Sequence, residues 1–107
     1  MKGKCVCPFC EILARRSPAN IRYEDEQVIV IDNILKWVPV MPQSHVTQSQ
    51  LWGSDLMATV GRVAVDMGER SCPGGYRLLS NFGDDAMQSQ EHGHLHVLGG
   101  TFLGQYA

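Results

Sequence analysis

Residues 91–100 read Glu91-His92-Gly93-His94-Leu95-His96-Val97-Leu98-Gly99-Gly100, with three histidines at a spacing of two. This alternation, closed by two glycines, predicts a β-strand over residues 91–98. Successive side chains of a strand point to opposite faces, so the three histidines are expected to share one face and the residues between them the other. Three ionisable rings in a row are costly unless each has a partner, and they therefore indicate a functional site.

Further strands are expected on both sides of the chain's centre. The β-branched run Val28-Ile29-Val30-Ile31 predicts a strand over residues 27–32 that is buried on both faces. Residues 37–41 predict its neighbour, in which Pro39 favours a sheet edge or a bulge because it cannot donate to a ladder. Residues 76–82 predict the strand that precedes the histidines.

Two helices complete the expected fold. Pro8 favours the start of a short helix to about residue 16, because its missing N–H costs nothing in the first turn. Ser54 and Asp55 are suited to cap a long helix, which Cys72-Pro73-Gly74-Gly75 ends. The apolar residues at helical spacing in it are Leu56, Met57, Val60, Val63, Ala64 and Met67. Residues 1–107 are thus expected to form one α+β domain with an antiparallel meander sheet.

Composition narrows the classes of function. The chain has 107 residues, of which 44% are hydrophobic and 19% charged, as is ordinary for a folded globule. A net charge of -2 without a basic run disfavours a nucleic-acid partner. No apolar stretch approaches the roughly 20 residues of a membrane span, so we expect no membrane partner and a cytoplasmic location.

The cysteines are unevenly placed. Cys5, Cys7 and Cys10 fall in one short stretch and Cys72 lies far away, which is not the pattern of a disulfide framework. In a reducing compartment, a Cys-x-x-Cys pair such as Cys7 and Cys10 is typical of a metal clamp or of a redox dithiol. The pattern alone leaves both interpretations open.

The histidine face also has two possible chemical uses. The three imidazoles could bind a metal, or one imidazole could attack a substrate while its neighbours fix its tautomer and stabilise charge. Asn81, Gln88 and Ser89 lie in and after the loop before the histidines. Their amide and hydroxyl donors suit phosphate oxygens, which favours phosphoryl chemistry.

Taken together, these motifs resemble the signature of the histidine triad (HIT) family. The matching blocks are Asn81-Phe82-Gly83, Ala86-Met87-Gln88-Ser89 and residues 92–100, which end as in the family's Hint branch. Earlier blocks match in order: Tyr23-Glu24-Asp25, Ile31-Asp32 and Val40-Met41-Pro42-Gln43-Ser44-His45. The resemblance covers nearly the whole chain and implies a HIT-like fold.

The resemblance implies a nucleotidyl hydrolase or transferase. His94 would attack the α-phosphorus of a purine nucleotide conjugate to form a covalent nucleotidyl-histidine, which water then cleaves. His96 would steady the phosphate, and Asn81, Gln88 and Ser89 would hold phosphate oxygens and the leaving group. Asp32 matches the carboxylate that grips the ribose. Phe9 and Ile12 match apolar walls of the purine pocket, although core packing explains them equally well.

The resemblance also implies a structural zinc ion, as in some bacterial members. The ligands would be Cys7, Cys10, His45 and His92, two thiolates and two imidazoles that suit a closed tetrahedral site. Cys5 is an alternative to Cys7. The rival dithiol interpretation requires a core strand before the motif, and the first six residues are short and polar.

Three classes of function follow: the hydrolase, a non-catalytic purine nucleotide-binding protein, and, ranked last, a dithiol oxidoreductase. Among substrates, nucleoside phosphoramidates and aminoacyl-adenylates come before dinucleoside polyphosphates. The family further implies a homodimer through the long helix and the strand over residues 76–82. Trp37 and Met87 replace a histidine and a glycine found in many relatives, which alters the surroundings of the nucleophile.

Overall fold

The computed structural model describes residues 7–32, 37–88 and 90–105. Its strands are β1 (Ile21–Glu24), β2 (Val28–Ile31), β3 (Trp37–Pro42), β4 (Tyr76–Leu79) and β5 (Leu95–Gly99). Its helices are α1 (Pro8–Leu13), α2 (Gln48–Trp52), α3 (Leu56–Ser71) and a short 3-10 turn, η1 (Asp84–Ala86).

The five strands form one sheet in the order β1-β2-β3-β5-β4, and every neighbouring pair is antiparallel. This confirms the predicted mixed fold with an antiparallel sheet. The meander runs through β1, β2 and β3, after which β5 enters between β3 and β4. The histidine-bearing strand therefore occupies an interior position of the sheet rather than its edge.

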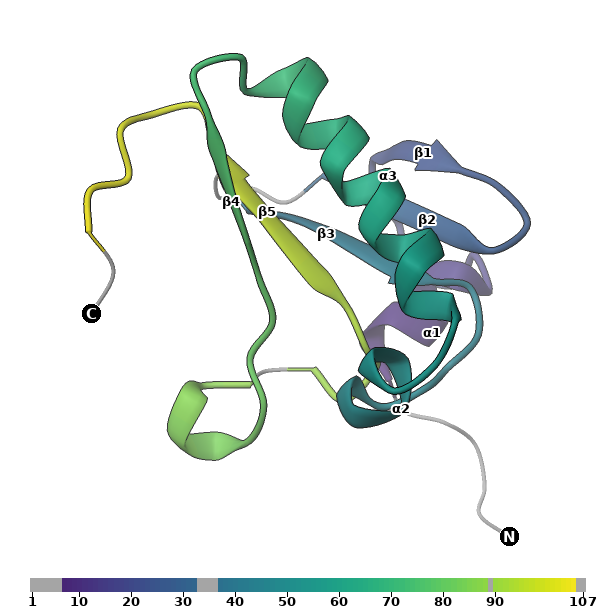
Figure 1. Ribbon diagram of the computed structural model, residues 1–107. Helices are drawn as coiled ribbons and strands as arrows, with labels where there is room; N and C mark the ends of the chain where they lie inside the picture. Colours follow the sequence, from purple (N-terminus) through teal and green to yellow (C-terminus); the bar gives the residue numbers. More distant parts are fainter. Residues whose placement is uncertain (1–6, 33–36, 89, 106–107) are drawn as a thin grey trace, which may run out of the picture.

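Two layers of helix cover the sheet, with α3 crossing one face (Figure 1). Alternate residues of β2 serve both layers: Val28 and Val30 belong to the cluster packed with α3, whereas Ile29 and Ile31 belong to the cluster packed with α1. All four are buried, as predicted for a strand covered on both faces. The same alternation in β5 sends Leu95 and Val97 toward α3. The His96 imidazole between them therefore faces the α1 side.

Pro39 contradicts the expectation of an edge or a bulge. β3 lies inside the sheet, and Pro39 pairs regularly with His96 of β5. On the other side of β3, the pairing with β2 reaches only as far as Val40, which lies opposite Val30 and is the residue after Pro39. The missing N–H is tolerated because Pro39 lies beyond that last β2 pair.

Two predicted strands are shorter than expected at the end near the histidines. β4 ends at Leu79 instead of residue 82, and β5 begins at Leu95 instead of residue 91. Before β5, the Gly93 N–H donates to the carbonyl of Val46, in the loop before α2, at 2.6 Å. His92 and His94 thus precede the regular strand and are held by loop contacts.

The helix ends also differ from expectation. α1 stops at Leu13 because Arg15 adopts a φ of 63°, and the N–H groups of Arg16 and Ser17 donate back to the Glu11 carbonyl. α3 begins as predicted, but Asp55 makes no side-chain cap hydrogen bond. Its own backbone is already helical, so its carboxylate is poorly placed to reach the first free N–H groups.

The sequence interpretation overlooked two elements, β1 and α2. β1 alternates apolar and polar residues over only four exposed positions, a weak signal. α2 carries a stronger one, because Thr47 and Gln50 form a capping box in which each side chain accepts a hydrogen bond from the other's N–H. That spacing in Thr47-Gln48-Ser49-Gln50 predicts a helix start.

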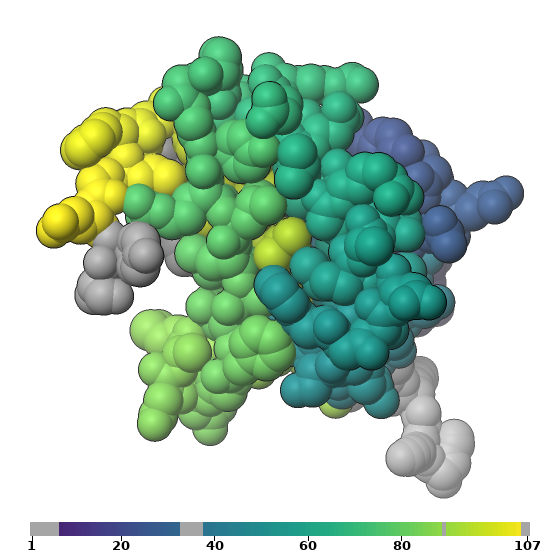
Figure 2. All heavy atoms as spheres, viewed as in Figure 1, coloured from purple at the N-terminus to yellow at the C-terminus, as the bar shows by residue number. Residues whose placement is uncertain are grey.

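With all atoms drawn, α2 and α3 cover part of the face of the sheet seen in Figure 2, and a small yellow patch of β5 shows between these helices and β4. The chain after β5 extends away from the body. Within the described ranges, no helix combines the length and the apolar character that crossing a membrane requires.

Candidate functional site

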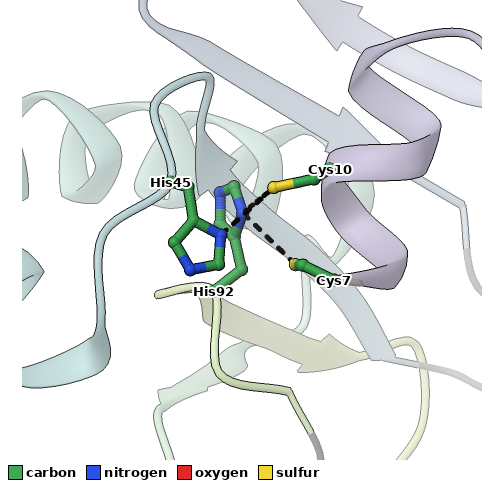
Figure 3. A group of neighbouring side chains, drawn as sticks. All are labelled: Cys7, Cys10, His45 and His92. Carbon is green, nitrogen blue, oxygen red and sulfur yellow. Dashed lines mark hydrogen bonds between the residues drawn. The ribbon is translucent and has the colours of Figure 1, made fainter. Parts of the chain in front are cut away.

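Four metal-binding side chains converge from three parts of the fold. Cys7 and Cys10 flank the first turn of α1, His45 lies in the loop after β3, and His92 precedes β5. Their sulfur and nitrogen atoms all lie within 4.8 Å of one another. Figure 3 shows both cysteines pointing from α1 toward the two imidazoles. The structure therefore brings together all four predicted metal ligands.

Two of the three distances match a tetrahedral ion. The Nδ1 atom of His92 lies 3.7 Å from the sulfur of Cys7 and 3.7 Å from that of Cys10. The Nδ1 atom of His45 lies 3.1 Å from the Cys10 sulfur. Bonds of about 2.0 to 2.3 Å around tetrahedral zinc separate the ligand atoms by about 3.3 to 3.8 Å. The two thiols and two imidazoles thus fit a zinc site.

The second nitrogen of each imidazole supports this assignment. His92 Nε2 lies 2.9 Å from the carbonyl of Pro42, which can only accept, so Nε2 carries the proton and Nδ1 offers its lone pair to the thiols. His45 Nε2 lies 3.9 Å from a carboxylate oxygen of Glu91. Burial lowers the pKa of His92, which keeps the ring neutral as metal binding requires.

His94 is oriented by the backbone of the first histidine. Its Nδ1 lies 2.8 Å from the carbonyl oxygen of His92, so Nδ1 carries the proton and Nε2 has a free electron pair. The ring is buried, and this burial lowers the pKa of His94. A neutral imidazole with a defined tautomer is a competent nucleophile.

His96 completes the row. Its Nε2 lies 3.1 Å from Nε2 of His94, and their rings meet edge to face with centroids 4.6 Å apart. Because the His94 nitrogen is an acceptor, His96 Nε2 must donate. Burial, followed by the neighbouring charge of His94, lowers the pKa of His96 to about 4.

Phe9 lies between the candidate metal cluster and His94. Its ring packs edge-on against His92 at 5.7 Å and against His94 at 5.2 Å between centroids. Phe9 is buried in the α1 cluster, against which the half-buried Ile12 also packs. Both residues therefore have the core role that sequence left open, and Phe9 lies beside the histidines as well.

The predicted phosphate-binding residues lie in the segment between β4 and β5. Asn81 is half-buried, and its carbonyl accepts a hydrogen bond from Gln48. The side-chain amide of Gln88 closes this loop, accepting from the Gly83 N–H at 2.7 Å and donating to the Gln90 carbonyl at 2.9 Å. Ser89 lies outside the described residues.

Two other predicted residues, Asp32 and Met87, lie on segments other than those that carry the three histidines. Asp32 follows β2, where its carboxylate is partly exposed and pairs with Arg22 at 2.8 Å. Met87 adopts the left-handed conformation with a φ of 61° and a side chain that is 83% exposed. A glycine adopts such a φ without strain.

One residue that contacts His94 was not anticipated. Gln48 is 2% exposed, and its side-chain oxygen accepts from the main-chain N–H of His94 at 3.0 Å. The capping box at Thr47 would have predicted the helix that carries it. Nothing in the pattern marks a glutamine in a short helix as buried.

Comparisons with known proteins agree with this geometry. The model of the HIT domain matches residues 14–103. An uncharacterized HIT-like protein of Chlamydia trachomatis is 36% identical over 93 residues, covering 79% of this chain and 84% of the relative.

Solved structures match over most of their length. A HIT family hydrolase from Clostridium thermocellum has a TM-score of 0.86 and 31% identity, with 97% of this chain and 98% of that chain covered. A zinc-bound histidine triad family protein from Mycobacterium smegmatis has a TM-score of 0.79 and 25% identity, with 95% and 80% covered. A hypothetical histidine triad nucleotide-binding protein from Sulfolobus tokodaii has a TM-score of 0.77 and 30% identity, with 94% and 72% covered. The chain belongs to the HIT family.

Proposed function

We propose that the chain is a nucleotidyl hydrolase or transferase that uses His94 on the α-phosphorus of purine nucleotide conjugates. The carrying observation is the 2.8 Å contact between His94 Nδ1 and the His92 carbonyl, which directs the lone pair of Nε2 away from the backbone. Its neutral state is favoured by burial. The similarity to a HIT family hydrolase supports hydrolysis as the class of reaction.

The reaction would proceed in two displacements. His94 Nε2 forms a bond to phosphorus, and the leaving amine departs with the electron pair of the P–N bond and takes a proton from water. Water then attacks the phosphorus, the P–N bond to His94 breaks, and nucleoside monophosphate leaves. His96 Nε2, which donates to His94 in the free protein, would turn its N–H to a phosphate oxygen.

The remaining substrate contacts follow the family's pattern. Asn81, Gln88 and Ser89 would hold phosphate oxygens and the leaving group. Phe9 and Ile12 would form part of the purine wall, which the packing of Phe9 against His94 supports. For Asp32 to grip the ribose hydroxyls, its carboxylate would exchange Arg22 for the sugar.

We propose nucleoside phosphoramidates and aminoacyl-adenylates as the first substrate class, with dinucleoside polyphosphates second. The alternative is a non-catalytic purine nucleotide-binding protein with the same residues, which the similarity to a nucleotide-binding protein from Sulfolobus tokodaii supports equally. A dithiol oxidoreductase is disfavoured, because Cys7 and Cys10 both face imidazoles.

Cys7, Cys10, His45 and His92 would hold a structural zinc ion that fixes α1 to the sheet. Thiolate ligands persist in a reducing compartment, which supports a cytoplasmic location. We also propose a homodimer through α3 and β4, because β4 is an edge strand whose side chains are only half-buried.

The test compares the purified protein with His94→Ala in hydrolysis of adenosine phosphoramidate, with AMP binding measured by calorimetry on both. We expect turnover by the wild type, none by His94→Ala, and AMP binding retained in the variant. Tight AMP binding without turnover by the wild type would overturn the hydrolase and leave the binding protein.

A further inference from the structure

The main chain of His94 is held on both sides by one short helix. α2 lies beside the segment that carries the histidines, and the fit is close at Gly93. A side-chain carbon built at Gly93 would lie 3.0 Å from both the Leu51 Cβ and the Thr47 carbonyl. α2 begins with the capping box of Thr47 and Gln50.

The first contact is to the N–H of His94. Gln48 accepts this hydrogen bond at 3.0 Å, and its amide nitrogen donates to the Asn81 carbonyl at 3.3 Å. Both polar atoms of this buried glutamine are therefore used, one on each of two segments that border the site.

The second contact is to the carbonyl of His94. The Ser80 hydroxyl donates to it at 2.6 Å and accepts from the indole N–H of Trp52 at 3.2 Å. Trp52 lies one helical turn after Gln48, on the same face of α2. The same helix thus reaches the N–H of His94 directly and its carbonyl through Ser80.

We propose that Gln48 is a positioning residue for the nucleophile, acting with Trp52 and Ser80 as a clamp on the His94 main chain. The inference rests on the proposed function, because positioning matters only if His94 Nε2 attacks phosphorus. A reacting nitrogen must approach within about 3 to 3.5 Å in line, and a displacement of 1 Å costs about 10²-fold in rate. Loss of the acceptor leaves a buried N–H unsatisfied, and the chain must move or admit water.

The test is Gln48→Met, which keeps the length and apolar volume of the side chain but offers His94 no amide acceptor. The matched control is Gln50→Met on the same helix, which breaks the capping box without removing a contact to His94. We measure kcat, KM and the exchange rate of the His94 amide proton for each protein, well below its unfolding temperature.

We expect Gln48→Met to lower kcat by about 10- to 100-fold with KM nearly unchanged. The His94 amide proton should exchange at least about tenfold faster. Gln50→Met should keep the kcat and the His94 exchange rate of the wild type. Equal losses of kcat in both variants would show a merely structural helix and overturn the inference.

An active Gln48→Met variant with wild-type kcat would also overturn the clamp while leaving the hydrolase intact. No turnover by the wild type would instead overturn the proposed function itself. The amide exchange of His94 does not depend on turnover, so the two failures are distinguishable.

Discussion

The candidate metal cluster and His94 are adjacent but are built in different ways. The cluster consists of four side chains, two thiols and two imidazoles, whose identities fit a zinc ion. His94 depends instead on main-chain groups: the His92 carbonyl orients its ring, and Gln48 and Ser80 hold its backbone. One region is defined by residue type, and the other by backbone geometry.

The two regions meet at His92. Its imidazole faces the thiols of α1, while its carbonyl accepts from His94 Nδ1. A change in the cluster can therefore reach the nucleophile through a single residue, whereas a change at His94 need not disturb the cluster.

Metal removal should have the largest effect. A strong chelator added to the zinc-loaded protein should lower its unfolding temperature by more than about 10 °C, since structural zinc contributes several kcal/mol and each is worth about 4 to 8 °C in a domain of this size. Calorimetry with metal analysis on the same sample measures this. Cys72→Ser, which changes a thiol outside the cluster, should respond like the wild type. Equal unfolding temperatures with and without metal would contradict the structural role.

Acid should weaken the fold through His96. Its pKa is about 4 in the folded chain and near 6.5 when unfolded, so between pH 6.5 and pH 4 the unfolded chain takes up this proton and the folded chain does not. The free energy of unfolding should fall by up to about 3 kcal/mol between pH 6.5 and pH 4, with no further loss from this group below that.

The measurement is denaturant unfolding at several pH values, beside His96→Asn. The difference between the two proteins removes the contributions of the metal ligands, which both share. A pH dependence that is identical in the variant would show that His96 is not the group responsible.

Met87→Gly should give the smallest effect, a stabilisation of about 1 kcal/mol, because a residue with a side chain is strained at a φ of 61°. The Met87 side chain is 83% exposed, so its removal costs little packing. Met87→Ala keeps the Cβ and should gain nothing. The free energies of unfolding of the three proteins are measured in urea. A glycine variant less stable than the wild type would show that the backbone at Met87 is not strained.

The sequence predicted the features that depend on residue identity. The resemblance to the HIT family implied the four metal ligands, which the structure brings together, and the buried run in β2 was confirmed on both faces. These features can be recognised in the sequence because each one requires a particular type of side chain or a particular spacing of residues.

Main-chain contacts were not predictable in the same way. The start of β5 at Leu95 follows from the bond between Gly93 and the Val46 carbonyl, across a sequence gap that no local pattern reports. Pro39 was misplaced because tolerance of proline depends on where its neighbouring strand ends. Gln48 was missed for a similar reason, since only the tertiary fold buries it against His94.

The most direct test of the account is to trap the covalent intermediate. The protein is mixed with excess adenosine phosphoramidate, quenched within milliseconds in base, and analysed by mass spectrometry of the intact chain and its peptides. If His94 is the nucleophile, we expect a nucleotidyl adduct on the peptide that carries His94 and none in His94→Ala. Hydrolysis with no adduct at any time, or an adduct that persists in His94→Ala, would contradict it.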